Sequence, residues 1–118
     1  MILSKSIYYI FPSWKNGFAH MVAFRNVLYW LLANSLGGKN RIKILNELFQ
    51  NPSNTHELSK NLGIEYKTVQ YHLQVLEDNK LIESAGKKYG KTYFITDKLT
   101  ENKQYFDEIK NNLKKGNK

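Results

Sequence analysis

The sequence predicts a mainly helical fold that carries one small β-hairpin. Apolar residues recur at helical spacing along most of the 118 residues. In one short stretch, residues 81–96, the pattern changes to an alternation typical of strands, around a turn rich in lysine and glycine. Glycine and proline fall between these stretches. A chain of this length fits one small domain with one modest core.

The N-terminal part, residues 1–38, contains an irregular apolar stretch followed by a helix. The helical pattern covers residues 18–35 and ends at Gly37-Gly38. The predicted helix is apolar on nearly every side, so other parts of the structure must cover it. We expect a second copy of the chain to do so. Two alternatives stay open: the helix lies in the core of its own chain, or it contacts a membrane.

The middle part, residues 39–96, begins with three predicted helices. The stretch "NRIKILNELFQN" forms a helical apolar stripe, which Asn51-Pro52 ends. Asn54 and Glu57 have the spacing of a capping box and start a short second helix, which ends at Gly63. The third helix covers residues 66–78. Two short helices joined through a glycine turn are typical of a helix-turn-helix.

The third helix, residues 66–78, has an apolar face and an opposite polar face. Val69, Leu73 and Leu76 lie within one narrow sector of the helical wheel. The polar side chains opposite them are of types that hydrogen-bond to base edges in the major groove. We therefore expect base contacts from Lys67, Thr68, Gln70, Tyr71 and Gln74.

The hairpin follows the third helix directly. The stretches "LIESAG" and "KTYFIT" read as strands, and "KKYG" between them reads as a turn. Basic side chains crowd this tip, residues 87–91. A hairpin with a basic tip beside such a helix is a wing, whose lysines position a protein on phosphates or in the minor groove.

The C-terminal part, residues 97–118, is predicted to be one helix over residues 97–115. Its apolar residues form a seam that needs a partner surface, since an isolated helix of this length is marginal in water. We expect a second subunit to provide that surface, although the helix has the alternative of packing on its own domain. The predicted dimer interface, from both terminal helices, comprises Met21, Phe24, Leu28, Leu31, Leu32, Phe106, Ile109 and Leu113.

The composition limits the class of function. The formal net charge of +8 favours a polyanionic partner, nucleic acid first. The absence of cysteine excludes disulfides and thiolate metal sites. His20, His56 and His72 show no ligand spacing, so we expect no metal and no cofactor. No phosphate-binding glycine loop or serine nucleophile motif is present, and we expect that the protein is not an enzyme.

The segment "HELSKNLGIEYKTVQYHLQVLEDNKLIESAGKKYGKTYFIT" resembles a winged helix-turn-helix transcription regulator. It is similar to the ArsR-like group common in archaea, and the likeness covers residues 40–96. The positions that carry it are Gly63-Ile64, Thr68-Val69, His72-Leu73 and Val75-Leu76. The resemblance implies a homodimer joined by terminal helices, the base contacts given above, and His72 near a phosphate. Metal-sensing members of the group use cysteines, which this chain lacks.

The sequence thus predicts a homodimeric, sequence-specific regulator that binds double-stranded DNA. Helix 66–78 would lie in the major groove and wing 87–91 on phosphates or in the minor groove. The expected DNA backbone contacts are Arg41, Thr55, His56, His72, Lys87, Lys88, Tyr89 and Lys91. We expect a cytoplasmic protein. Two alternatives stay open: a winged-helix module that binds proteins of the transcription machinery, and a membrane-associated regulator that uses residues 1–35.

Overall fold

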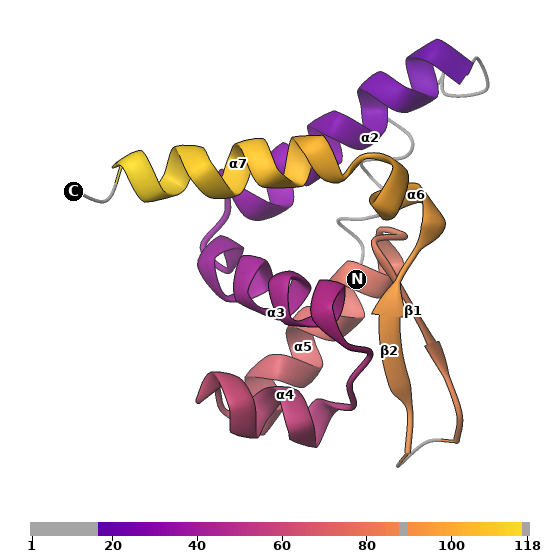
Figure 1. The fold of residues 1–118 in the computed structure, drawn as a ribbon, viewed down its shortest axis with the longest axis vertical. Helices are drawn as coiled ribbons and strands as arrows, with labels where there is room; N and C mark the ends of the chain where they lie inside the picture. The colour runs from indigo at the N-terminus through magenta and orange to yellow at the C-terminus, as the bar shows by residue number, and fades with distance from the viewer. Residues whose placement is uncertain (1–16, 88–89, 117–118) are drawn as a thin grey trace.

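The computed structural model describes the backbone of residues 17–87 and 90–116, and the side chains of residues 23–87 and 90–115. Within these residues the fold is mostly helical, and a two-stranded antiparallel hairpin follows the helix-turn-helix (Figure 1). This architecture confirms the predicted fold class. The elements are α2 (Gly17–Leu32), α3 (Gly38–Gln50), α4 (Thr55–Leu62), α5 (Tyr66–Asp78), β1 (Ile82–Ala85), β2 (Thr92–Ile95), α6 (Asp97–Glu101) and α7 (Lys103–Gly116).

Local signals in the sequence set the ends of α4 and the start of α5. The side chain of Asn54 accepts from the backbone N–H of Glu57 at 2.8 Å, and the backbone N–H of Asn54 donates to the Glu57 carboxylate at 2.9 Å. This capping box confirms the prediction. Gly63 ends α4 with a φ of 66°, a left-handed conformation that glycine adopts without strain. Glu65, the N-cap residue of α5, makes no side-chain capping hydrogen bond.

The hairpin is anchored to the rest of the domain through Tyr93 of β2. Strands β1 and β2 pair from Ile82 opposite Ile95 to Ala85 opposite Thr92. The backbone of Tyr93 also exchanges two hydrogen bonds with Ser53, at 2.8 and 3.2 Å, just before α4. This bridge makes the loop before α4 a short third partner of the hairpin, so the wing has a defined direction relative to the helix-turn-helix.

The C-terminal helix is interrupted, contrary to the single helix that we predicted. Thr96 caps α6, which ends at Asn102. The side-chain amide of Asn102 donates to the carbonyl of Lys98 at 2.8 Å, and its backbone N–H donates to the carbonyl of Leu99 at 3.0 Å. A short polar side chain that bonds to a nearby carbonyl competes with the helical pattern, which accounts for the break. Helix α7 then crosses α2 above α3 (Figure 1).

Most of the apolar residues of the terminal helices that we predicted to form a dimer interface are buried within the single chain. Within the single chain, α2 packs against both α3 and α7. One core cluster joins residues of α2, α3, α5 and α7. The members of the predicted interface that are buried in it are Phe24, Leu28, Leu31, Leu32, Phe106 and Ile109. Leu113 is half-buried, and the side chain of Met21 lies outside the described residues.

In the ranges 17–87 and 90–116, no helix combines the length and the apolar character that crossing a membrane requires.

Candidate nucleic-acid interface

Helix α5 presents one face to the core and the opposite face to solvent. Val69, Leu73 and Leu76 are completely buried, as the periodicity predicts. Lys67, Gln70 and Gln74 are exposed and Thr68 is half-buried. The structure therefore brings the predicted base-contacting side chains together on one accessible surface.

Two tyrosines give this surface an aromatic character. Tyr71 is 49 % exposed and Tyr66 is 44 % exposed, which is high for large rings. Sequence reasoning named Tyr71 but missed Tyr66, although Tyr66 is the first residue of α5 and lies one position before Lys67. We add Tyr66 to the candidate site, because tyrosine hydroxyls bond to phosphates and base edges.

Gln74 is already hydrogen-bonded on this surface. Its side-chain amide donates to the carboxylate of Asp78 at 2.9 Å, one turn further along α5. The bond orients the amide, and it places a negative charge beside it. Gln74 would have to exchange this partner, or share it, to make a bidentate pair with a base.

Arg41 and His72 form a buried network instead of two exposed contacts. The Arg41 Nε donates to His72 Nδ1 at 3.2 Å, and Nη1 donates to the carbonyl of Leu31 at 3.0 Å and to Ser35 Oγ at 2.8 Å. Only 4 % of Arg41 and 5 % of His72 is exposed. These side chains link the end of α2 to α3 and α5, so neither of them lies on the exposed surface where we expected it.

The network favours a neutral imidazole. Burial lowers the pKa of His72, and the positive charge of Arg41 lowers it further. Because Nδ1 accepts from Arg41, the ring proton of the neutral form belongs on Nε2. Burial also lowers the pKa of Arg41, while its interaction with Tyr71 acts in the opposite direction. The ring of Tyr71 meets that of His72 edge-on, with 5.3 Å between centroids.

Thr55 is also buried, in contrast to its predicted role at the DNA backbone. It is the first residue of α4, and its side chain hydrogen-bonds to Tyr93 of the hairpin. Burial raises the pKa of Tyr93, and this hydrogen bond opposes that shift. Thr55 thus joins α4 to the wing, whereas the neighbouring His56 is exposed.

The described lysines of the wing are accessible. Lys87 and Lys91 are exposed on either side of the tip. The other two predicted contacts, Lys88 and Tyr89, lie outside the described residues. In Figure 1, β1 and β2 run alongside the helices from the side of α6 toward the level of α4.

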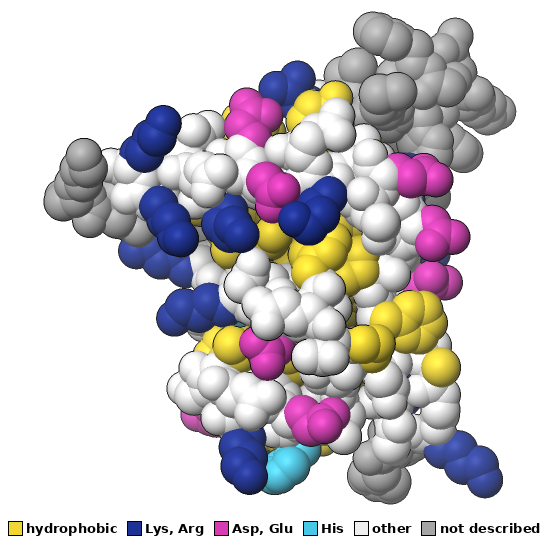
Figure 2. Space-filling view, viewed as in Figure 1, with side chains coloured by type: hydrophobic (Ala, Val, Ile, Leu, Met, Phe, Trp, Pro, Cys, Tyr) yellow, Lys and Arg dark blue, Asp and Glu magenta, His cyan; other side chains and the backbone are white. Residues whose placement is uncertain are grey.

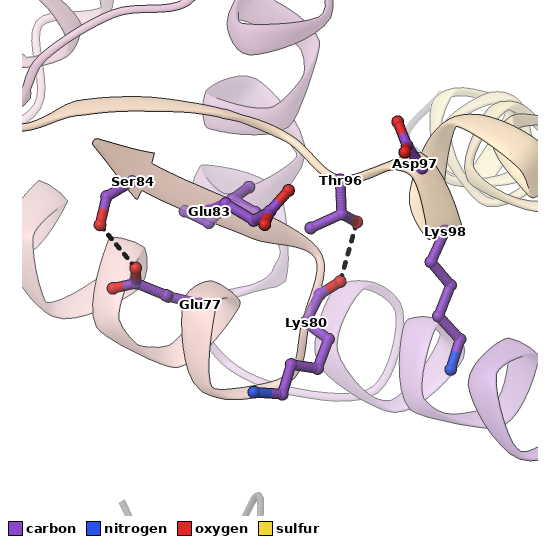
Figure 3. A pocket seen from close by; sticks show the side chains of 8 residues that line it. Glu77, Lys80, Glu83, Ser84, Thr96, Asp97 and Lys98 are labelled. Atoms are coloured by element: carbon purple, nitrogen blue, oxygen red, sulfur yellow. Dashed lines mark hydrogen bonds between the residues drawn. The ribbon is translucent and has the colours of Figure 1, made fainter.

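Contacts at the base of the hairpin fix it against the C-terminal end of α5 (Figure 3). Ser84 Oγ donates to the Glu77 carboxylate at 2.7 Å, and Thr96 Oγ1 donates to the carbonyl of Lys80 at 2.9 Å. Lys80 itself has a φ of 66° in the turn after α5. Several acidic side chains lie here, but in the described part of the chain no group of three His, Cys, Asp or Glu residues could hold a metal ion.

The positive charge of the chain is not concentrated on α5, where Lys67 is the single Lys or Arg residue. Figure 2 shows basic side chains gathered over α3 and α7 on one side of the molecule. Four lysines there surround a shallow groove with an apolar floor of Ile42 and Leu113. The residues of this basic rim are Lys39, Lys43, Lys110 and Lys114.

The middle of the chain is similar to a known family of regulatory proteins. Residues 38–84, from the start of α3 into β1, match the family described as "Bacterial regulatory protein, arsR family". No curated protein matches the chain. The matched region contains all of α3, α4 and α5 and therefore the whole candidate face of α5. Over residues 38–84 the chain is therefore similar to the helix-turn-helix domain of the ArsR family of bacterial regulatory proteins.

Proposed function

We propose that the protein is a sequence-specific regulator of transcription that places α5 in the major groove of double-stranded DNA. The observation that carries the proposal is the exposed polar and aromatic face of α5 within an ArsR-family domain. An α-helix fits the major groove, and the side chains of this face match the donor and acceptor patterns found there. The family match favours binding over catalysis as the activity of this domain.

The proposed contacts divide into two groups. Lys67, Thr68, Gln70, Tyr71 and Gln74 would contact base edges, because they project from the face of α5 opposite the core. Tyr66, His56 and the wing residues 87–91 would contact phosphates or the minor groove and fix the register of the protein on the duplex. Arg41, His72 and Thr55 would hold these elements in place from within the fold.

We further propose that the regulator acts as a homodimer through the outer face of α2. Asn26, Tyr29 and Ala33 lie three and four residues apart, on the side opposite the core residues Phe24 and Leu28. Asn26 is exposed, and Tyr29 and Ala33 are half-buried. A small residue beside an aromatic one allows close approach of a second helix, and a single asparagine in a helix seam favours one register. Two copies of α5 would then address half-sites about 34 Å apart.

The proposed function is tested by removing two side chains from α5. Lys67→Ala together with Gln74→Ala should weaken binding to the preferred duplex by about 2 kcal/mol or more, which is roughly 30-fold, if each contact contributes at least about 1 kcal/mol. The matched control is Gln104→Ala with Lys115→Ala, which removes the same residue types from exposed positions on α7. Equal affinities of the two double variants would contradict the placement of α5 and favour a protein-binding role for the domain.

A further inference from the structure

A pocket lies where the end of α2, α3 and α5 meet. It adjoins the polar face of α5. Trp30 and Leu36 line it from the end of α2 and the turn that follows. Asn40 and Arg41 line it from the first turns of α3, and Thr68 and Tyr71 from α5. The pocket therefore lies between the elements that the Arg41 network connects.

The pocket contains a cation without an anionic partner. All ten acidic side chains of the chain lie in the described part, and none of them pairs with Arg41. Nε and Nη1 donate to neutral groups of Leu31, Ser35 and His72, and the guanidinium also hydrogen-bonds to the side chain of Tyr71. A buried charge is normally paired, because desolvation makes an isolated one costly. Desolvation accordingly lowers the pKa of Arg41.

The Nη2 edge of the guanidinium lies beside Gly37 at the pocket wall. A methyl group placed on Gly37 would come within 3.0 Å of Nη2 and 2.6 Å of the His72 ring. Glycine at this position therefore keeps the space in front of the guanidinium open. Guanidinium groups bind carboxylates and phosphates strongly, since both their charge and their donor geometry match.

The other wall of the pocket is apolar. Trp30 is half-buried and Leu36 is fully exposed. Covering such apolar side chains and so removing them from water is favourable in free energy. A ligand with an apolar body would cover both side chains while its charged end reached Arg41. Ligand sites commonly combine such an apolar lining with a few polar groups that fix orientation.

We propose that this pocket binds a small organic anion, a carboxylate attached to a compact aliphatic or aromatic body. Arg41 would neutralise the carboxylate, Asn40 and Thr68 would offer hydrogen bonds, and Trp30 and Leu36 would cover the apolar body. The bound anion also provides the counter-charge that Arg41 lacks within its own chain.

Occupancy of the pocket would change DNA binding, and this part of the inference rests on the proposed function. Thr68 and Tyr71 belong both to the pocket and to the proposed base-contacting face. A ligand that engages them alters the donors available to bases and adds negative charge near the duplex. We expect the anion to weaken DNA binding, which would make it an effector of the regulator.

The site can be tested without DNA through the fluorescence of Trp30. The chain has two tryptophans, so Trp14→Phe leaves Trp30 as the single reporter. The probes are cyclohexanecarboxylate, its neutral analogue cyclohexanecarboxamide, and inorganic phosphate. We expect a saturable change with the carboxylate, and at least about tenfold weaker binding of the amide, because a desolvated charge pair is lost. We also expect phosphate to bind at least about tenfold more weakly, because it has no apolar body.

Variants at Leu36 test the location, because this exposed side chain does not contribute to the core. Leu36→Glu places an anion at the pocket rim and should weaken carboxylate binding by about tenfold relative to the neutral control Leu36→Gln. Arg41→Gln is less informative by itself, since it also removes the hydrogen bonds to Leu31 and Ser35 that support the fold.

Three results of the fluorescence titrations would overturn the site: no saturation by the carboxylate, equal binding of carboxylate and amide, or equal effects of Leu36→Glu and Leu36→Gln. Phosphate binding as tight as that of the carboxylate would overturn the organic ligand and assign the pocket to a DNA phosphate.

A second titration measures DNA affinity with and without the carboxylate. We expect weaker DNA binding in the wild type and a smaller effect in Leu36→Glu. An unchanged DNA affinity at saturating carboxylate would overturn the effector role. A protein that binds the carboxylate but no DNA would instead contradict the proposed function, since the fluorescence measurement contains no DNA.

Discussion

Replacing Lys67 distinguishes a contact with a base from a contact with a phosphate. It is exposed and is the single Lys or Arg residue of α5. We predict that Lys67→Ala weakens binding by about 1–3 kcal/mol and reduces the preference for the specific duplex, with little change in salt dependence, if Lys67 contacts a base. If it contacts a phosphate, the affinity for all sequences falls and the slope of log Kd against log salt decreases by about 1. Lys115→Ala, at an exposed position on α7, is the control.

His72 makes the stability of the fold sensitive to mild acid. Burial and Arg41 lower the pKa of His72 in the folded protein, so the unfolded chain takes up a proton at higher pH than the folded one. The free energy of unfolding should therefore fall as the pH drops below about 6.5, and should stop falling from this cause once the pH passes the folded-state pKa. Urea unfolding of the wild type at several pH values measures this.

Two variants identify the group responsible for this pH dependence. His72→Gln keeps an acceptor for Arg41 Nε but does not titrate, so its stability should depend less on pH between about 7.5 and 5. His56→Gln, at an exposed position, should behave like the wild type. Identical pH profiles for wild type and His72→Gln would contradict the role of the buried imidazole.

At the scale of residues, the sequence predicted the two faces of α5 but not the Arg41 network. Helical periodicity relates positions within one helix, which is why Val69 and Tyr71 were correctly assigned to opposite sides of α5. The partners of Arg41 are a backbone carbonyl ten residues earlier and a histidine 31 residues later. Such contacts depend on how the helices pack, and no local pattern specifies them.

At the scale of elements, the turn between α4 and α5 depends on the conformation of Gly63. We predict that Gly63→Ala lowers the free energy of unfolding by about 1–2 kcal/mol, because an L-residue with a side chain is strained at positive φ. Chemical denaturation measures the change. Gly90→Ala is a matched control, since a methyl group meets no atom within 4 Å at either position but φ is positive only at Gly63. Equal losses in both variants would show that backbone strain at Gly63 is not the cause.

Element boundaries were predictable where a local signal defines them. The capping box of Asn54 and Glu57, the left-handed Gly63 and the strand pattern of β1 and β2 all act within a few residues. The sequence did not predict the break between α6 and α7. The side-chain amide of Asn102 bonds to the carbonyl of Lys98. An asparagine within a helical pattern can equally face solvent, so its presence alone does not indicate a break.

At the scale of the whole molecule, an apolar stripe indicates burial but not the identity of the covering surface. Leu28, Leu32, Phe106 and Ile109 were correctly expected to be buried, and we assigned their cover to a second copy. The structure instead packs α7 and α3 of the same chain against α2. Helical periodicity does not distinguish the two kinds of cover, because a helix of the same chain and a second copy would bury the same apolar stripe.

The proposed dimer can be tested on the side of α2 that the core leaves accessible. We predict that Tyr29→Glu with Ala33→Glu gives a folded monomer, because two like-charged helix faces repel and neither residue is fully buried. Sedimentation velocity measures the mass, and circular dichroism measures helix content. The control is Gln104→Glu with Asn112→Glu, at exposed positions on α7. A Tyr29/Ala33 variant that stays dimeric would exclude this face of α2 as the interface.

The central claim is that the α5 face and the wing bind DNA sequence-specifically. A fluorescence-anisotropy titration at several salt concentrations tests it most directly. A duplex from upstream of the protein's own gene is compared with a scrambled duplex of the same composition. We predict tighter binding to the native duplex and a steep loss of affinity with salt, whose slope reports the number of phosphates contacted. No binding to either duplex at low salt would contradict the claim.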